Sequence, residues 1–538
     1  MNKYKIYLPL LFSVVLAGGL YLGYRIGSSA ASGDESSFYL PVQKGGKLDN
    51  ILQFIEQDYV DTVNSEMLEN NAIKGMLEKL DPHSQYITAE EFHEMNDPLL
   101  GSFEGIGVSF RIEKDTITVI NPVKGGPSEK VGIMAGDRIV FIDDSLVAGI
   151  KVTNRDAMRK LKGKKGTQVR VKIHRRGMEG LSDFTITRDV IPTYSLDASY
   201  MVNKQIGYIR LNKFAATTYE EFVDAAEKLK DEGMTQLILD LRGNTGGYLK
   251  AATDLTDEFL SQDKLIVYTQ GKNRPKSFSF AHRSGLFEEE DIIVLIDEGS
   301  ASASEIVAGA LQDNDRGTII GRRSFGKGLV QEQLSMRDGS ALRLTVARYY
   351  TPTGRSIQKP YDGDFEKYHH ESFDRYDNGE MMNADSIHQT DTVKFITPKG
   401  KIVYGGGGIT PDVYVPLESD SSLFFYNRLA NSGLIFQYAF DYADIKRAEL
   451  SKFKNVEAFK TQFNMTDQML KELYQLAEEK GISKPAAISS ESKKYIRTLF
   501  KAYVGRNILD DAGFYPIYQE IDPILLKAIS YLKDQPKS

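Results

Sequence analysis

The sequence predicts a multidomain α/β protein, and three patterns support this prediction. Between about residues 191 and 415, short apolar strands alternate with amphipathic helices, which is typical of an α/β core. Between about residues 96 and 190, brief strands of alternating polarity are separated by glycine turns, which indicates a β-rich module ahead of that core. Apolar residues recur at helical spacing on both sides of these regions, so a helical region is expected at each end.

Composition sets broad limits on the function. The chain of 538 residues is long enough for about three or four domains. Its net charge is −7, with acidic and basic residues interspersed, which argues against nucleic-acid binding because that function requires a basic stripe. The chain contains no cysteine, so disulfides and cysteine-bound metals are excluded, and the redox compartment is left open.

The N-terminus carries a candidate membrane anchor. Residues 6–24 are uncharged, and as a helix these 19 residues would be about 28 Å long, close to the roughly 30 Å hydrocarbon core of a bilayer. Lys3 and Lys5 precede the run and favour the cytoplasmic side. We therefore expect a retained transmembrane helix with the body of the protein on the exported side, periplasmic or extracytoplasmic. The alternative is a signal peptide cleaved after Ala31, since Ser29 and Ala31 offer the small residues that processing needs.

A helical region follows a polar linker. Apolar residues recur at helical spacing from Leu48 to Tyr59 and from Leu68 to Leu80, and the turn Asp81-Pro-His-Ser ends the second run. We expect these helices to form a packing subdomain.

Ser302 is the first candidate catalytic residue. A buried strand is predicted at Ile292–Ile296, and a helix begins directly after Ser302. At such a helix start, free backbone N–H groups and the helix dipole stabilise a developing oxyanion. The simpler interpretation is a capping box in which Ser302 and Glu305 only satisfy the N–H groups of the helix.

Lys327 and Gln331 favour the catalytic interpretation. Lys327 lies between two glycines, and residues four apart share a face on strands and helices, so its amine should meet the amide of Gln331. An ordinary lysine has a pKa of about 10.4 and is almost entirely protonated near neutral pH. A catalytic Lys327 must therefore be buried enough for its pKa to approach the working pH.

Three segments together resemble the C-terminal processing peptidases, also called tail-specific proteases: Gly299–Glu305, Phe325–Gln331 and Tyr349–Gln358. These are serine endopeptidases with a Ser/Lys dyad and a PDZ domain. The resemblance implies Ser302 as nucleophile, Lys327 as general base and Gln331 as the residue that orients the lysine. It also implies an acyl-enzyme mechanism without metal or cofactor, and a homodimer assembled partly by the N-terminal helical region.

A glycine loop at Arg242–Gly247 follows a predicted strand and precedes a predicted helix. Such a loop could cradle phosphate, but the lysine and serine of a nucleotide-binding loop are missing. The resemblance implies instead an oxyanion hole formed by the backbone N–H of Ala303 and that of either Gly246 or Gly247. The sequence does not distinguish the two glycines.

The β-rich module contains a glycine loop at Gly105–Val108 and, further on, the run Ala135-Gly-Asp-Arg-Ile-Val140, and with these segments it resembles a PDZ domain. Successive N–H groups of its glycine loop would form a nest for a peptide's terminal carboxylate, while the peptide adds a strand to the sheet edge. We therefore expect the protein to bind unfolded or flexible C-terminal peptides of exported proteins. Side chains of Val108 and Met158 would select an apolar last residue. The expected peptide-binding residues are Gly105, Ile106, Gly107, Val108 and Met158.

Other hydrolytic chemistries have weaker support. The seven histidines are distant from Ser302 in sequence, and none has an accompanying G-x-S-x-G elbow. The S-x-x-K patterns at Ser451 and Ser530 fall in amphipathic tail segments without companion motifs. His93 and the pair His369-His370 lack the H-E-x-x-H spacing of zinc peptidases, and residues 361–390, which also contain His388, are expected to be a solvated loop.

The resemblance thus specifies an α/β serine-peptidase core with an inserted β-rich PDZ domain, an N-terminal helical region and a C-terminal helical domain for packing or docking. An anchored PDZ scaffold with an inactive core remains the alternative, and a crotonase-like acyl-transfer enzyme would need a nucleotide-tail pocket for which the sequence gives no sign. The expected divisions are 1–27 for the anchor or signal, 28–95 for the linker and helices, 96–190 for the PDZ domain, 191–415 for the core and 416–538 for the tail.

Overall fold

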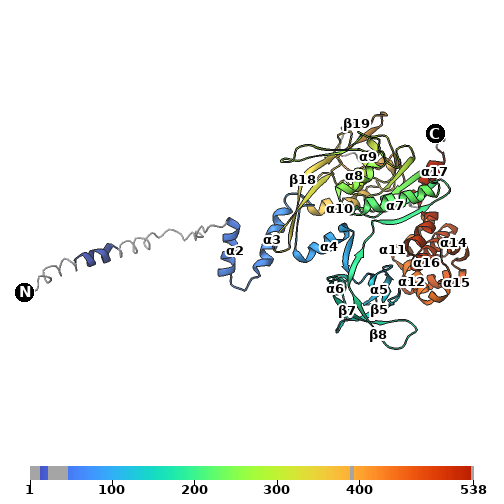
Figure 1. Ribbon diagram of the computed structural model, residues 1–538, viewed down its shortest axis with the longest axis horizontal. Helices are drawn as coiled ribbons and strands as arrows, with labels where there is room; N and C mark the ends of the chain where they lie inside the picture. The colour runs from blue at the N-terminus through green and yellow to red at the C-terminus, as the bar shows by residue number, and fades with distance from the viewer. Residues whose placement is uncertain (1–12, 22–45, 388–392, 418–419, 535–538) are drawn as a thin grey trace, which may run out of the picture. The chain divides into compact units, whose positions relative to one another are not determined.

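The computed structural model describes residues 13–21, 46–387, 393–417 and 420–534 (Figure 1). The chain forms two compact units, residues 1–75 and 76–538. Residues 13–21 are helical, whereas the rest of the apolar run 6–24 and the alternative cleavage site near Ala31 lie outside the described residues. Within the described ranges, the structure contains no helix with the length and apolarity needed to cross a membrane.

The first unit does not form the expected packing subdomain. Helix α2 (Lys47–Asp58) buries none of its residues, and its apolar side chains Leu48 and Phe54 expose 49% and 40% of their surface. The following helix, α3 (Ser65–Leu77), buries only Leu77. The apolar periodicity therefore predicts the helices correctly, but within the described part of this unit their apolar faces have no layer to pack against.

The β-rich module is an antiparallel sheet in the order β3-β4-β5-β7-β8, with β6 beside β5. Strand β7 alternates strictly between exposed and buried residues, as expected for a half-buried strand. A pair of stem strands, β2 and β9, joins the entry and exit of the module. The elements are β2 (Ser102–Gly105), β3 (Val108–Glu113), β4 (Thr116–Pro122), α5 (Pro127–Lys130), β5 (Arg138–Ile142), β6 (Ser145–Leu146), α6 (Asn154–Leu161), β7 (Gln168–His174), β8 (Ser182–Thr187) and β9 (Asp189–Pro192).

The α/β core is built on a sheet in the order β10-β11-β12-β15-β16-β21, parallel except for the edge strand β10. Its central strands are continuous apolar runs because both faces are covered. Helices α7, α8 and α9 cover one face (Figure 1). The elements are β10 (Leu196–Met201), β11 (Ile206–Leu211), α7 (Thr218–Asp231), β12 (Gln236–Asp240), α8 (Leu249–Asp257), β15 (Asp291–Ile296), α9 (Ala303–Asp313), β16 (Thr318–Gly321) and β21 (Val413–Tyr414).

Two neighbouring strands of this sheet position the candidate site. Strands β12 and β15 are parallel and directly paired, with Asp240 opposite Leu295. The carboxyl ends of parallel strands meet at the same edge of a sheet, so the loops that follow these two strands lie together. One of those loops contains Gly246, and the other contains Ser302.

A second sheet, in the order β1-β18-β13-β14 with β17 beside β18, carries Gln331. Its elements, with the adjoining helix, are β1 (Gln85–Ile87), α4 (Ala89–Leu100), β13 (Leu265–Gln270), β14 (Ser277–Phe280), β17 (Leu329–Ser335) and β18 (Ala341–Tyr350).

The polar segment 361–390 is not the solvated loop that the sequence predicts. Much of it is helix α10 (Phe365–Asp377), which buries Tyr368 and Arg375. The helix is followed by a short 3₁₀ turn, η2 (Ala384–Ser386), and by the paired strands β19 (Lys394–Ile396) and β20 (Ile402–Tyr404). Arg375 is buried because it donates to the buried carboxylate of Glu380, a tertiary partner that composition does not reveal.

The C-terminal region is helical, as predicted, and has its own core of apolar side chains. Its last helix, α17, leaves that core and packs on the face of the α/β sheet opposite α7, α8 and α9, against Ile293 and Leu295 of β15. The elements are η3 (Ser421–Leu423), α11 (Phe424–Asn431), α12 (Leu434–Ile445), α13 (Arg447–Leu450), α14 (Val456–Gln462), α15 (Asp467–Glu479), α16 (Ser490–Tyr518), η4 (Gln519–Ile521) and α17 (Pro523–Asp534).

Candidate active site

Ser302 lies at the sharp turn between β15 and α9. It is the residue before the first turn of α9, and its backbone angles are φ 55° and ψ −112°. A positive φ is uncommon for a residue with a side chain and costs conformational energy, and such strained residues concentrate at functional sites. The position agrees with the sequence prediction, and the strained backbone is an additional feature that supports a functional role.

Glu305 does more than cap its own helix. Its carboxylate is fully buried and accepts hydrogen bonds from the backbone N–H of Ser302 (2.8 Å), Gly326 (2.7 Å) and Lys327 (2.9 Å), and from the Ser324 hydroxyl (2.5 Å). Ser302 and Lys327 donate to the same oxygen, Oε2. Burial raises the pKa of Glu305, although these four donors oppose the increase. The expected capping glutamate therefore also ties the lysine segment to the serine turn.

Tyr349 on β18 also connects the serine turn with the lysine segment. Its hydroxyl lies 2.8 Å from the carbonyl oxygen of Lys327 and 3.1 Å from that of Ser302. The tyrosine is buried, with 1% of its surface exposed, so this contact is shielded from competing water.

Lys327 and Gln331 meet as the sequence predicts. The lysine Nζ donates to Gln331 Oε1 at 3.1 Å, and Gln331 Nε2 donates to the backbone oxygen of His83 at 3.0 Å. Burial lowers the pKa of Lys327, and the positive charge of Arg343 lowers it further. Within the described residues, the hydrogen bond of the amine is to Gln331 and none is formed with the Ser302 hydroxyl.

His83 is a site neighbour that sequence reasoning missed. Its ring Nε2 lies 2.9 Å from the Tyr368 hydroxyl, and burial, assisted by the charge of Lys327, lowers its pKa to about 3. The ring is therefore neutral at ordinary pH, and its backbone carbonyl is the group that reaches Gln331. The only sequence signal is the turn Asp81-Pro-His-Ser, which by itself predicts no more than the end of a helix.

Gly246 lies directly against the serine turn. A Cβ atom at this position would be 2.8 Å from Ser302 Cβ and 2.9 Å from the backbone nitrogen of Ala303, so only glycine fits. The N–H of Gly246 already donates to Asn244 Oδ1 at 2.9 Å. The N–H groups of Gly247 and Ala303 have no acceptor among the described residues.

These residues share one cleft of about 1300 Å³. The cleft is lined by both the candidate nucleophile and the candidate base. The lining residues come from four segments that are separate in sequence: the glycine loop, the serine turn, the lysine segment and β18. Apolar side chains of Phe92, Leu99, Leu329 and Val330 form part of its wall. Its lining includes Gly246, Gly247, Ser302, Ala303, Lys327, Gln331 and Tyr349.

The predicted peptide loop of the β-rich module lies before β3, an edge strand of its sheet. The carbonyls of Ile106 and Gly107 accept hydrogen bonds from within the module, and Gly107 has φ 71°. Ile106 is buried in the module's apolar core, so its side chain is not available to a peptide and only its N–H could take part. Val108 and Met158 are partly buried.

The competing sites gain no support. Ser451 and Ser530 donate only to acceptors within the tail helices. His388 and the side chain of His93 lie outside the described residues. In the part of the chain that the structure describes, no group of three His, Cys, Asp or Glu side chains is arranged to hold a metal ion.

Family comparisons agree with this organisation. Residues 205–366 match peptidase family S41, residues 105–185 match the PDZ domain, residues 14–91 match the activating protease CtpB N-terminal domain, and residues 425–510 match a family of unknown function. The fold and these matches define the class of protein: a serine-type endopeptidase with an S41 core and a PDZ domain.

The chain belongs to the family of carboxy-terminal processing proteases. It is 38% identical over 353 residues to the carboxy-terminal-processing protease of Bartonella bacilliformis, an alignment that covers 64% of this chain and 80% of that protein. It is 35% identical over 359 residues to CtpA of Bacillus subtilis, covering 66% and 76%. The solved photosystem II D1 C-terminal processing protease aligns with 68% of this chain and 87% of its own at 25% identity and a TM-score of 0.35.

Proposed function

We propose that this endopeptidase captures exposed C-termini of exported proteins on its PDZ domain and cleaves them with a Ser302/Lys327 dyad. The observation that carries the proposal is the state of Lys327: its amine is held by Gln331 and depressed in pKa by burial, in the same cleft as Ser302. A lysine with a lowered pKa is a better proton acceptor near neutral pH than an exposed lysine, because a larger fraction of it is neutral.

The chemistry follows an acyl-enzyme sequence. Lys327 takes the proton of the Ser302 hydroxyl as Oγ attacks the scissile carbonyl carbon, and the new oxyanion is stabilised by backbone N–H groups. The protonated lysine then gives its proton to the leaving amine, and a water molecule activated by Lys327 releases the acyl group. We assign the N–H donors to Gly247 and Ala303, because the N–H of Gly246 is already bound to Asn244.

Peptide capture is assigned to the loop Gly105–Val108 and the neighbouring edge strand β3. The carbonyls of Ile106 and Gly107 accept hydrogen bonds from the module itself, which leaves the loop's N–H groups as the donors for a carboxylate. The edge of β3 supplies a ladder for an added peptide strand. Val108 and Met158 remain the candidates for contact with the last side chain.

The anchoring and self-association predictions remain proposals based on the sequence and on exposed helices. Residues 6–24 would hold the protein in a membrane with its body exported, and the exposed apolar residues of α2 would pair two copies. N-terminal sequencing of the mature protein tests the first, because processing after Ala31 would contradict a retained anchor. Light scattering tests the second, and a monomer at micromolar concentration would contradict it.

Cleavage of an unfolded protein by the soluble portion tests the dyad. Ser302→Ala and Lys327→Ala should each abolish fragments while keeping peptide binding, and Gln331→Ala should reduce the rate without abolishing it. Ser451→Ala and Lys454→Ala are matched controls, because they alter the unrelated S-x-x-K pattern in the tail. Retained turnover by either dyad variant would refute the mechanism, and absence of cleavage by the wild type would leave the PDZ scaffold as the better interpretation.

A further inference from the structure

We propose that the C-terminal helical region contributes to catalysis, because its residue Asp522 positions the glycine loop 242–247 beside Ser302 by binding the Arg242 guanidinium. This inference rests on the proposed function of that loop as a source of oxyanion-hole donors. Asp522 touches no reacting atom in this assignment and acts through Arg242, as a positioning residue.

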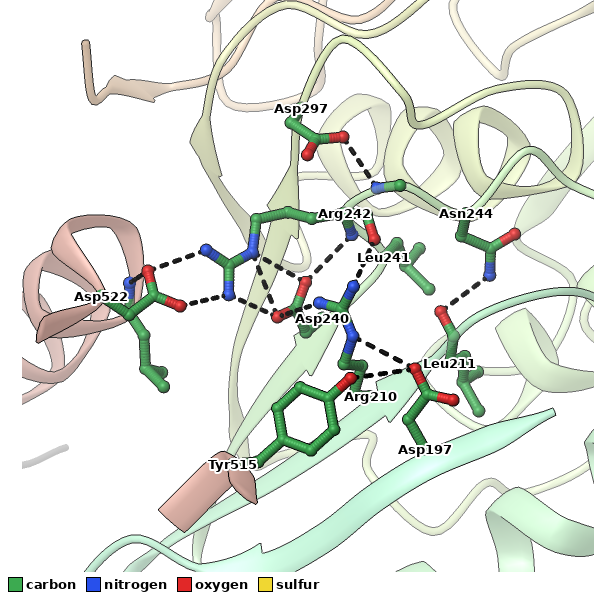
Figure 2. A network of polar contacts seen from close by, with 12 residues as sticks. Asp197, Arg210, Leu211, Asp240, Leu241, Arg242, Asn244, Asp297, Tyr515 and Asp522 are labelled. Atoms are coloured by element: carbon green, nitrogen blue, oxygen red, sulfur yellow. Dashed lines mark hydrogen bonds and ion pairs between the residues drawn. The ribbon is translucent and has the colours of Figure 1, made fainter. Parts of the chain in front are cut away.

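The contact between the tail and the loop is a two-point ion pair. Arg242 Nη1 donates to Asp522 Oδ1 at 2.8 Å, and Nη2 donates to Oδ2 at 2.7 Å. Asp522 is 3% exposed, so the pair is shielded from water. Figure 2 shows Asp522, the residue directly before α17, reaching the guanidinium on the side away from Asp240. Two parallel hydrogen bonds fix the direction of the guanidinium as well as its distance.

The charge balance explains why the second acid is needed. Asp240 is fully buried and binds both Arg242 (Nη2 to Oδ2, 2.6 Å) and Arg210 (Nη1 to Oδ2, 2.9 Å). Arg210 also reaches Asp197, whereas the other carboxylate on Arg242 is Asp522 (Figure 2). Without Asp522, Asp240 would be the remaining carboxylate partner of Arg242 and would be shared with Arg210, and an incompletely paired, largely buried charge is unfavourable.

Arg242 begins the glycine loop, so its position sets the path of the residues that follow. Beyond it, Gly243 N–H donates to Asp297 at 2.8 Å, and Asn244 Nδ2 donates to the oxygen of Leu211 at 3.0 Å (Figure 2). Asn244 Oδ1 then accepts from Gly246. The chain of contacts from Asp522 thus ends at the glycine that packs against the Ser302 side chain.

The tail itself holds Asp522 firmly. Asp522 Oδ1 accepts from the N–H of Leu525 at 3.1 Å, which caps the start of α17. Leu525 in turn packs with Leu295 of β15, the strand that leads to Ser302. Nearby, Tyr515 donates to Asp197 at 3.2 Å, so a second residue of the tail joins the same network (Figure 2).

The first test compares Asp522→Asn with a matched control. Asparagine keeps the shape and caps a helix as well as aspartate does, so the change removes the charge while sparing the cap. We expect kcat to fall by about 10- to 1000-fold, the upper value being that for complete loss of an oxyanion donor. KM should stay within about twofold, since the donors act mainly in the transition state. Asp467→Asn, which removes the acid of an exposed tail ion pair with Arg497, should change neither constant.

Arg242→Lys provides a second variant. Lysine keeps the charge but cannot form the fork that binds two carboxylates, so kcat should fall as it does in Asp522→Asn. Asp522→Glu retains the carboxylate and should therefore be more active than Asp522→Asn. If the asparagine variant loses about 100-fold in kcat, the glutamate variant should have a kcat at least about tenfold higher than the asparagine variant. Wild-type kcat in both Asp522→Asn and Arg242→Lys would overturn the proposal.

A second measurement does not depend on activity. Backbone amide exchange of the peptide covering residues 242–249 is measured in a Ser302→Ala background, with and without Asp522→Asn. We expect faster exchange confined to this loop, and none with Asp467→Asn. Unchanged exchange, or acceleration spread evenly over the whole core, would overturn the positioning role. Amide exchange does not depend on catalysis, so it tests the positioning role of Asp522 even if the proposed Ser302/Lys327 mechanism is wrong. The positioning role and the protease mechanism can therefore be refuted independently.

Discussion

The amine of Lys327 is the group on which the proposed chemistry depends, and its surroundings favour the neutral form. Burial and the nearby Arg343 both disfavour protonation, while Gln331 offers a fixed acceptor. In the proposed mechanism the neutral amine is the active form, so kcat/KM should rise with pH and fall as the lysine becomes protonated. The midpoint should lie below the pKa of about 10.4 of an ordinary lysine.

Arg343→Gln tests this assignment through the pH profile. Removing a neighbouring positive charge raises the pKa of Lys327, so the midpoint of the rising limb should move to higher pH. Arg348→Gln, on the same strand but exposed, should leave the midpoint in place. An unmoved midpoint in the Arg343 variant would mean that another group controls the limb. His83 is a poor candidate for that group, because its pKa is already lowered to about 3.

Gly246 gives a second prediction at this scale. Gly246→Ala should lower kcat and destabilise the fold by more than about 1 kcal/mol, because the new Cβ would combine a positive φ with a close approach to Ser302. Gly433→Ala, in the tail, is the control: it also has a positive φ, of 72°, but its Cβ would meet no atom within 4 Å. Denaturant unfolding should show a loss of stability for both variants, whereas kcat should fall for Gly246→Ala alone.

The residues that the sequence could predict were those tied by local spacing. Lys327 and Gln331 are four residues apart, and Ser302 begins a helix, so periodicity was enough to pair or place them. His83, Asn244 and Tyr349 reach the site only through tertiary contacts, the longest spanning 248 positions from His83 to Gln331. A local sequence pattern does not predict which distant backbone carbonyl a side-chain amide will bind after folding.

At the scale of elements, the turn at Asp81–Ser84 is a structural support for strand β17, which carries Gln331. Asp81 Oδ1 accepts from the N–H groups of His83 and Ser84 at 2.8 Å each, and the Thr345 hydroxyl donates to the same oxygen. The turn thereby fixes the His83 carbonyl that receives Gln331 Nε2.

A double-mutant cycle tests this support. Asp81→Ala should lower kcat about as much as Gln331→Ala, and the double variant should lose little more, since both break one chain of contacts. Asp338→Ala is a suitable control, because Asp338 forms a similar turn with Ser340 on an exposed hairpin. Losses that simply add in free energy would contradict the coupling.

Elements with strong periodicity were predicted well, and those held by polar partners were not. Strand β15, predicted at Ile292–Ile296, spans Asp291–Ile296, and helix α9 begins directly after Ser302 as predicted, because their apolar patterns are regular. Helix α10 was missed, since its burial depends on ionic and ring contacts such as Lys359 with Glu371 and the Tyr368 ring. A polar composition alone therefore does not indicate a solvated loop.

At the scale of the whole molecule, the tail contacts the PDZ domain as well as the core. The Arg111 guanidinium on β3 lies 4.6 Å and 4.4 Å from the ring centroids of Phe436 and Phe440. Asn121 on β4 donates to Asp510 at 2.8 Å. The tail, which includes the region that matches a family of unknown function, therefore links the PDZ domain to the α/β sheet.

Arg111→Ala should loosen this joint. Two cation–π contacts contribute about 1 to 3 kcal/mol together, enough to raise the population of the undocked module about tenfold. Limited proteolysis at the stem strands β2 and β9 should accelerate accordingly. Arg170→Ala is the control, because Arg170 is exposed and pairs with Asp144 inside the module. Equal proteolysis of both variants would contradict a docking role for Arg111.

The tail's helices were predictable from their amphipathic pattern, but their partners were not. An apolar stripe on a helix indicates that this face is buried, but it does not indicate which element covers it. Helix α17 packs against the α/β sheet and not against the core formed by the other helices of the tail.

The order in which the chain is made gives the Arg242–Asp522 contact a further meaning. Asp522 follows Arg242 by 280 positions, and ribosomes make a chain from its N-terminus. Ser302 and Lys327 are therefore synthesised long before Asp522. On the proposed mechanism, a partly synthesised molecule would contain both dyad residues before the aspartate that positions the loop 242–247, and full activity would require the complete tail.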